Sequence, residues 1–185
     1  MKSPFLIGKQ VYLRGIEKED LPKFVAWIND CEVTYYMFMG DRPAHLEILI
    51  EQWEKEIRDP NEVVFAIVDK EGDKVVGSSG LYSINWISRL AEYRIFVGEK
   101  KYWGKGHAGE AGKLVIKYGF EKLNLNRIYL GVNAENIKAV LHNRRLGFIQ
   151  EGVLREEIFR NDKYYNVIRM GMLKKDYFKM KKKGV

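Results

Sequence analysis

Three glycines stand where one helical pattern of this chain begins, in the stretch Trp103-Gly104-Lys105-Gly106-His107-Ala108-Gly109. The N-terminus of a helix exposes unpaired backbone N–H groups and a partial positive charge, and glycine lets the backbone come close to a ligand. With the added charge of Lys105, the stretch predicts a pocket for a phosphate group. A strand-to-helix turn that binds nothing accounts for the glycines equally well, because a G-x-G pattern is short and often matches by chance.

Two well-known phosphate loops do not fit this stretch. The P-loop pattern Gly-x-x-x-x-Gly-Lys-[Ser/Thr] is absent from the chain. The dinucleotide-binding pattern G-x-G-x-x-G matches Gly104, Gly106 and Gly109, but it also needs a carboxylate about 20 residues further on. Residues 126–131 contain no carboxylate. The glycines must therefore be interpreted together with the elements around them.

Apolar residues recur with the period of a strand or of a helix along most of the chain, which predicts the elements that hold the glycine loop. Strands are predicted at 10–16, 63–68, 74–77, 90–97, 127–132, 148–159 and 164–173. Helices are predicted at 20–27, 43–58, 106–121 and 136–146, the first with Asp20 as its N-cap and the last closed by Gly147. This order indicates a mixed α/β (α+β) fold, a sheet with helices on its faces.

The composition is that of a single globular domain over residues 1–185. Hydrophobic residues make up 46% of the chain and charged residues 31%, and no low-complexity segment divides it. The single cysteine excludes an intramolecular disulfide, and a cytoplasmic location is the default for such a chain. No segment predicts a signal peptide or a membrane span, so we expect no membrane partner. The three histidines lack metal-ligand spacing, which predicts no metal site.

The formal net charge of +7 can attract anions, and part of it lies in a basic C-terminal tail at 174–185. A solvated helix end explains the lysines of this tail better than a contact with RNA does. Nucleic acid is therefore not the expected partner.

Three motifs occur in a fixed order. The first is the glycine loop, which fits [Gln/Arg]-x-x-Gly-x-[Gly/Ala] except that Trp103 stands in the first place. The second runs from Asn136 to Phe148 and fits N-x-x-A-[IV]…[KR]-x-G-F, and the third runs from Glu151 to Tyr164. Together they resemble the GNAT superfamily of acetyl-CoA-dependent N-acetyltransferases. The resemblance is strongest to the branch of ribosomal-protein N-terminal alanine acetyltransferases and spermidine N-acetyltransferases.

The resemblance implies a twisted, mostly antiparallel sheet of about seven strands with helices on both faces. It also implies an enzyme, an N-acetyltransferase that moves the acetyl group of acetyl-CoA onto a primary amine. Within the branch, the acceptor expected first is a protein N-terminal α-amine, and a polyamine or amino sugar is the alternative. A non-catalytic acyl-CoA-binding or RNA-associated module is an alternative from another class.

Carboxylates in the N-terminal third of the chain can form an acidic pocket for a polyamine: Glu17, Glu19, Asp20, Asp30, Glu32 and Asp41. Ordinary solvated surface charge explains them as well. The net charge of +7 argues weakly against a polycationic substrate.

The resemblance also assigns residues that bind CoA. It places the diphosphate on backbone N–H groups of the glycine loop, and the pantetheine between two parted strands, Ile95–Val97 and Tyr129–Val132. Asn136 would hydrogen-bond the pantetheine, and Arg145 would reach a CoA phosphate. The predicted cofactor-binding residues are Ile95, Phe96, Val97, Trp103, Gly104, Lys105, Gly106, His107, Ala108, Gly109, Asn136 and Arg145.

Glu92 and Asn143 are the predicted catalytic residues. Glu92 lies in the strand before the glycine loop, where family members place an acid, and it is the candidate general base. An ordinary surface ion pair with Arg94 is the other interpretation. Asn143 stands where many members carry a tyrosine general acid; it cannot donate a proton as an acid, but its amide can hydrogen-bond the leaving sulfur. Water, His142 or Tyr129 would then supply the proton.

The oligomeric state is not visible in the sequence. The final hairpin and exposed aromatic residues are compatible with a homodimer, but one sequence does not separate an interface from a core.

Overall fold

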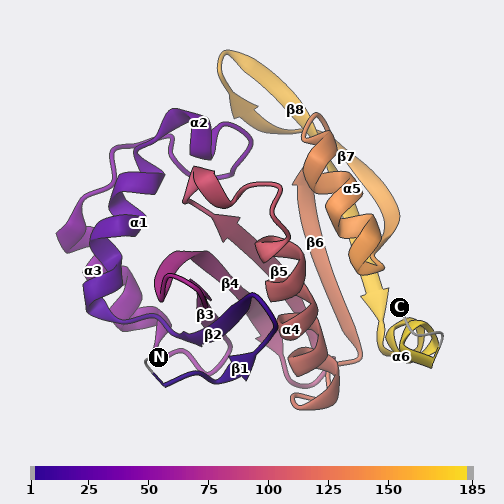
Figure 1. Ribbon diagram of the computed structural model, residues 1–185. Coiled ribbons are helices and arrows are strands. Elements are labelled where there is room, and N and C mark those ends of the chain that lie inside the picture. Colours follow the sequence, from indigo (N-terminus) through magenta and orange to yellow (C-terminus); the bar gives the residue numbers. More distant parts are fainter. Residues whose placement is uncertain (1–2, 183–185) are drawn as a thin grey trace.

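Eight strands form one sheet, in the order β1-β2-β3-β4-β5-β6-β8-β7, in the computed structural model, which describes residues 3–182 (Figure 1). The strands are β1 (Leu6–Ile7), β2 (Val11–Gly15), β3 (Val63–Asp69), β4 (Lys74–Asn85), β5 (Leu90–Val97), β6 (Arg127–Asn133), β7 (Ile149–Arg160) and β8 (Lys163–Leu173). Neighbouring strands are antiparallel except β5 and β6, which run parallel. The predicted mixed, mostly antiparallel sheet is confirmed, with the two-residue β1 as an additional edge strand.

Helices cover both faces of the sheet. On one face lie α1 (Leu21–Ile28), α2 (Cys31–Thr34) and α3 (Leu46–Glu56), and on the other lie α4 (His107–Glu121), α5 (Ile137–Leu146) and α6 (Lys174–Lys182) (Figure 1). Successive side chains of a strand point to opposite faces of the sheet, so β5 contributes side chains to the cores on both faces. Tyr93 is buried in the core beneath α4 and α5, whereas Phe96 packs against Trp27 of α1.

Of two predicted helix starts, one is confirmed in position and the other differs: Asp20 is the N-cap residue of α1, as predicted. Its side chain, however, makes no capping hydrogen bond to that helix. Its carboxylate instead binds Arg14 at 2.7 Å, and both side chains are buried. A buried guanidinium needs such a partner, which outweighs a helix cap. The second predicted helix begins at Leu46 rather than Pro43, because the Asn29 side chain bonds both the N–H and the carbonyl of Ala44 and holds that segment outside the helix.

The C-terminal helix α6 contains residues 174–182 of the predicted basic tail, and residues 183–185 lie outside the described part of the chain. The Tyr177 ring stacks on Phe120 of α4, and its hydroxyl donates to Glu121 at 2.6 Å. The helix is therefore packed onto α4 and is more than a solvated end. Within residues 3–182, none of the helices has the length and apolar character needed to cross a bilayer.

Candidate active site

The parallel strands β5 and β6 are paired only at their first residues and part beyond them (Figure 1). The last pair in register is Glu92 with Tyr129. From there β5 continues against β4 as far as Val97, and β6 continues against β8 as far as Asn133. The predicted separation of the two central strands is present, and it widens toward the end of β5 that leads into the glycine loop.

The peptide groups of β5 that face this gap follow from the hydrogen bonds on the other side of the strand. The Arg94 carbonyl accepts from the Ser79 hydroxyl of β4 at 3.2 Å, and the residue after the strand also bonds β4. Alternate residues of a strand direct their N–H and C=O groups to opposite neighbours. The N–H of Phe96 therefore faces β4, whereas those of Ile95 and Val97 face the gap. There they can bond an amide of a bound chain or an oxyanion that develops on a carbonyl.

The glycine loop enters α4 as predicted. Gly104 and Gly106 have φ angles of 73° and 90°, in the left-handed region that glycine adopts without strain. Gly106 is the N-cap of α4, and no side chain of the described residues caps this helix. The Glu110 N–H is bonded to the Gly106 carbonyl at 3.0 Å, so the N–H groups of residues 106–109 precede the helical hydrogen bonds. They carry the positive end of the helix dipole and form a site for an anion.

The side chains of the loop take different directions. The Trp103 indole N–H donates to the Val97 carbonyl at 2.8 Å, which ties the loop back to the end of β5. Lys105 is exposed. His107 is turned inward and buried, with Nε2 2.9 Å from Asp69 Oδ1. His107 can therefore contact a bound cofactor through its backbone N–H but not through its imidazole ring.

The helix α5 lies beside the first turns of α4. A Cβ atom at Gly109 would be 3.8 Å from Cε1 of His142. Asn136 caps α5, because its side-chain oxygen accepts from the Ala139 N–H at 3.1 Å. The NH₂ group of Asn136 is then the part of this side chain that can bind pantetheine.

Asn143, on the same helix, is buried. Its Oδ1 and the Nε2 of His142 are buried without a hydrogen-bond partner among the described residues. Burial, together with the nearby charge of Arg145, lowers the pKa of His142 and favours its neutral form. Arg145 itself is exposed. Unsatisfied buried polar atoms need an explanation, and a polar ligand beside α5 provides one.

Glu92 lies at the closed end of the gap, and its side chain is only 16% exposed. Its carboxylate binds the Arg94 guanidinium at 2.6 Å, so the ion pair considered as the other interpretation of Glu92 does form. The guanidinium also lies over the Tyr82 ring, 4.6 Å from the ring centre. A carboxylate and an aromatic face, the two groups that recognise an ammonium ion, thus lie together here.

Two further carboxyl groups lie near this pair. Glu56 at the end of α3 and Glu62 just before β3 are hydrogen-bonded to each other. Burial and the charge of Glu62 raise the pKa of Glu56 to about 7, while Arg94 acts in the opposite direction. Burial also raises the pKa of Glu62. Two carboxyl groups this close disfavour each other's ionised form. We call Glu56, Glu62 and Glu92, together with Tyr82 and Arg94, the carboxyl cluster. No pattern in the sequence pointed to Glu56 or Glu62.

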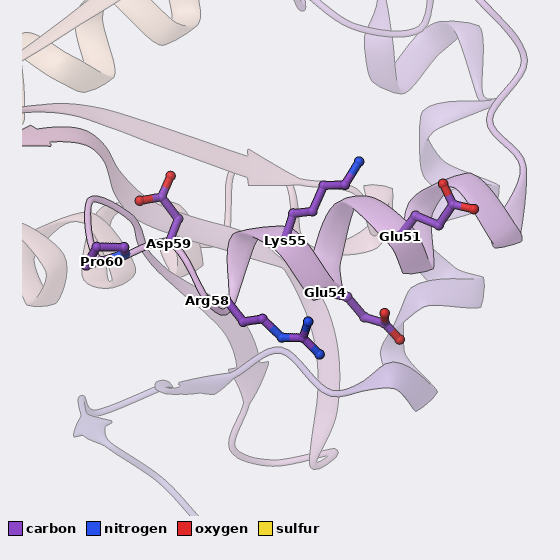
Figure 2. A pocket seen from close by; sticks show the side chains of 6 residues that line it. All are labelled: Glu51, Glu54, Lys55, Arg58, Asp59 and Pro60. Atoms are coloured by element: carbon purple, nitrogen blue, oxygen red, sulfur yellow. The ribbon is translucent and has the colours of Figure 1, made fainter.

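Two shallow hollows lie on the surface around α3. The first has charged side chains that spread into solvent (Figure 2) and is lined by Glu51, Glu54, Lys55, Arg58, Asp59 and Pro60. The second is lined by Asp59, Asn61, Glu62, Ser83, Ile84, Asn85, Trp86 and Ile87. Glu62 belongs to both the second hollow and the carboxyl cluster, so an acceptor can approach the cluster from this side. The first hollow contains no predicted site residue.

The acidic pocket considered in the N-terminal third does not form as a set. Asp20 is neutralised by Arg14 in the interior. Asp30 and Glu32 both bind Lys100, each at 2.8 Å. Within the described chain, no group of three His, Cys, Asp or Glu side chains is arranged to hold a metal ion.

Residues 10–149 match the model of the acetyltransferase (GNAT) domain, and the chain belongs to this family. It is therefore an N-acetyltransferase that uses acetyl-CoA. The spermidine N(1)-acetyltransferase of Escherichia coli (strain K12) is 40% identical over 90% of this chain and 88% of that protein. The putative ribosomal N-acetyltransferase YdaF of Bacillus subtilis is 23% identical over 92% of this chain and 95% of that protein.

A solved structure agrees with these relatives. The spermidine N-acetyltransferase of Vibrio cholerae in complex with CoA and spermine superposes with a TM-score of 0.85 and 35% identity, over 92% of this chain and 99% of that one. Relatives named for both parts of the predicted branch are thus found, and the predicted family is confirmed.

Proposed function

We propose that this N-acetyltransferase acetylates a polyamine. The observation that carries the proposal is the similarity to spermidine N-acetyltransferases, 40% identical in one case and 34% in another. The relative named as a ribosomal N-acetyltransferase is 23% identical. The sequence motifs favoured a protein N-terminal α-amine, but these similarities support the polyamine alternative instead.

The carboxyl cluster supports a cationic acceptor. An ammonium group is bound by carboxylates and by the face of an aromatic ring, and Glu92 and Tyr82 offer both within the same few ångströms. The guanidinium of Arg94 contacts both groups, and the Arg94 side chain is 56% exposed, so an incoming ammonium ion can take its place. Glu56 and Glu62 interact electrostatically with the same Arg94 and Tyr82, and they add negative charge for a second amino group of the same molecule.

The acetyl donor, acetyl-CoA, fits the end of the gap that lies beside the glycine loop, opposite to Glu92. The uncapped N–H groups of residues 106–109 suit the diphosphate of acetyl-CoA. The N–H groups of Ile95 and Val97 and the NH₂ group of Asn136 suit the pantetheine amides. The thioester then lies toward Glu92, where the strands close. The family's acetyl donor and the proposed acceptor thus meet from opposite ends.

The reaction is the attack of a neutral amine on the thioester carbonyl, followed by departure of the thiolate. An alkyl amine has a pKa of ~10.4, so presenting it neutral at pH 7 costs about 4.6 kcal/mol. Glu92 takes this proton, directly or through a water molecule. N–H groups of β5 stabilise the negative charge on the carbonyl oxygen. The new amide bond forms as the carbon–sulfur bond breaks, and the nitrogen gives up its second proton to solvent water.

The leaving thiolate needs less assistance than the amine. With a thiol pKa of ~8.5, release of the thiolate rather than the thiol at pH 7 costs only about 2 kcal/mol. Asn143 can hydrogen-bond the sulfur through its NH₂ group but cannot give up a proton. Solvent water then supplies the proton, and the reaction proceeds without the tyrosine that other members use.

A panel of amines tests the acceptor. Thiol release from acetyl-CoA is followed with spermidine, spermine, an amino sugar and peptides that carry a free α-amine. We expect kcat/KM for the polyamines to exceed that for the peptides by about 100-fold or more, because peptides have no second ammonium group for the cluster.

Preference for a peptide would contradict the polyamine proposal and return the acceptor to a protein N-terminus. Binding of CoA with no turnover on any amine would favour a non-catalytic module. Both results are distinct from a failure to bind CoA, which calorimetry measures without an acceptor.

A further inference from the structure

The side chain of His107 links the start of α4 to the end of the sheet. His107 is the first residue of the helix, only 7% exposed, and its Nε2 lies 2.9 Å from Oδ1 of Asp69, the last residue of β3. The Tyr102 ring packs edge-on against the imidazole, with ring centres 4.7 Å apart. A buried polar side chain thus stands in the middle of the glycine loop, on its inner side.

Asp69 is built to hold this imidazole. Its other oxygen accepts from the Gly72 N–H at 2.8 Å and from the Tyr102 hydroxyl at 3.3 Å. Burial raises the pKa of Asp69, but the hydrogen bonds from His107, Gly72 and Tyr102 outweigh it and bring the pKa below its usual value. The carboxylate is therefore charged at neutral pH, and Nε2–H of His107 donates to it.

No second hydrogen bond orients the imidazole. The Nδ1 atom of His107 is buried and has no partner within residues 3–182. Asp69 is therefore the group that fixes the ring and, through it, the first turn of α4. Glu110 in the same turn also accepts from the Gln10 and Val11 N–H groups, but His107 is the side chain that holds the first residue of the helix, directly after the left-handed Gly106. The N–H groups of residues 106–109 can converge on an anion only if this turn is held in place.

We propose that Asp69, acting through His107, is a positioning residue for the diphosphate of the acyl donor. This inference rests on the proposed placement of the diphosphate at the start of α4, and it is independent of which amine is acetylated. The bond does not touch the ligand. It fixes the geometry of the backbone N–H groups that do.

The test compares CoA with two shorter ligands: dephospho-CoA, which keeps the diphosphate but lacks the 3′-phosphate, and pantetheine, which lacks the diphosphate and the adenosine; we expect dephospho-CoA to follow CoA. Calorimetry gives Kd for all these ligands with the wild type, His107→Phe and His107→Gln. His107→Phe keeps a planar ring against Tyr102 but removes the bond to Asp69, so we expect the Kd for CoA to rise about tenfold and that for pantetheine to stay unchanged. His107→Gln places an NH₂ group where Nε2 stood and should restore most of the affinity for CoA.

Kinetics provide a second readout. In His107→Phe, the KM for acetyl-CoA should rise while kcat changes by no more than about twofold. Asp20→Asn is the matched control, because it weakens another buried ion pair, 2.7 Å from Arg14, far along the chain from the glycine loop. It should lower the melting temperature and leave the ratio of the Kd values for CoA and pantetheine at the wild-type level.

Three results would overturn the proposal. One is an equal loss of affinity for CoA and pantetheine in His107→Phe, which would indicate general damage to the fold. The second is no loss for either ligand. The third is a wild-type protein that binds pantetheine as tightly as CoA, since the diphosphate would then have no site to be positioned in. Asp69→Asn gives the same comparison if His107→Phe does not fold.

Discussion

Glu56→Gln should stabilise the protein at high pH and have no effect in acid. In the folded chain, burial and Glu62 raise the pKa of Glu56 from its ordinary value of 4.5 to about 7. At 1.36 kcal/mol per pKa unit, this shift corresponds to at most about 3 kcal/mol of lost stability once the carboxyl is ionised. The side chain is partly exposed, and solvent screening reduces the effect, so we expect about 1–2 kcal/mol.

The sign follows from proton binding. Between pH 4.5 and about 7 the folded chain keeps a proton on Glu56 that the unfolded chain has released. The free energy of unfolding therefore falls as the pH rises through this window, and the whole loss is present above it. Glutamine has no proton to lose and can still hydrogen-bond Glu62, so the variant escapes the loss.

Urea denaturation at pH 4.5 and pH 8.5 measures the effect. The variant should match the wild type at the lower pH and exceed it by about 1–2 kcal/mol at the higher pH, equivalent to about 2–8 °C in melting temperature for a chain of this size. Glu51→Gln, an exposed position on the same helix, is the control and should show no such pH dependence. Equal stability of Glu56→Gln and wild type at both pH values would refute the raised pKa.

Three further substitutions address the chemistry and the packing. Glu92→Gln should lower kcat with spermidine by about 100-fold, measured by thiol release, and a loss below about threefold would remove it as the base. Asn143→Tyr should raise kcat by about tenfold if the site can use a general acid, whereas Asn143→Phe, of the same size, should not; equal rates for the two would contradict this. Gly112→Ala places a methyl group 2.7 Å from the Tyr93 hydroxyl and should destabilise the protein by about 1–3 kcal/mol in urea, whereas Gly109→Ala, whose nearest neighbour is 3.8 Å away, should not.

The parts of the site that the sequence predicted are those set by local chemistry. A left-handed residue before α4 and another after α5 need glycine, and Gly106 and Gly147 supply it with φ angles of 90° and 101°. The mostly antiparallel sheet and the separation of β5 from β6 followed from the family resemblance rather than from any single pattern. The motif did not predict what Trp103 does, because its hydrogen bond to the Val97 carbonyl depends on the fold of the loop.

The parts that could not be predicted depend on contacts between distant segments. Glu56 and Glu62 lie in a polar stretch that predicts solvated charge, and they become partly buried only where the end of α3 and the start of β3 come together in the folded chain. Asp20 has the right type and position for a helix cap, yet a guanidinium six residues earlier takes its carboxylate. A periodic pattern locates an element but does not rank the partners that a polar side chain will find in the folded chain.

Asn143 stands where many family members carry a tyrosine general acid, so this chain has no such acid for the leaving thiolate. Removal of the proton from an alkyl ammonium costs about 4.6 kcal/mol at pH 7. Release of the thiolate without a proton costs about 2 kcal/mol. A chain that lacks the tyrosine forgoes help with the smaller of the two. It must then keep a group that assists the larger step, the deprotonation of the amine. Glu92 lies at the closed end of the gap and is paired with Arg94, a cation that we propose the amine displaces. In the proposed mechanism the acceptor side of this site therefore carries most of the catalytic effect, and we expect the rate to respond more strongly to changes at Glu92 than to changes at Asn143.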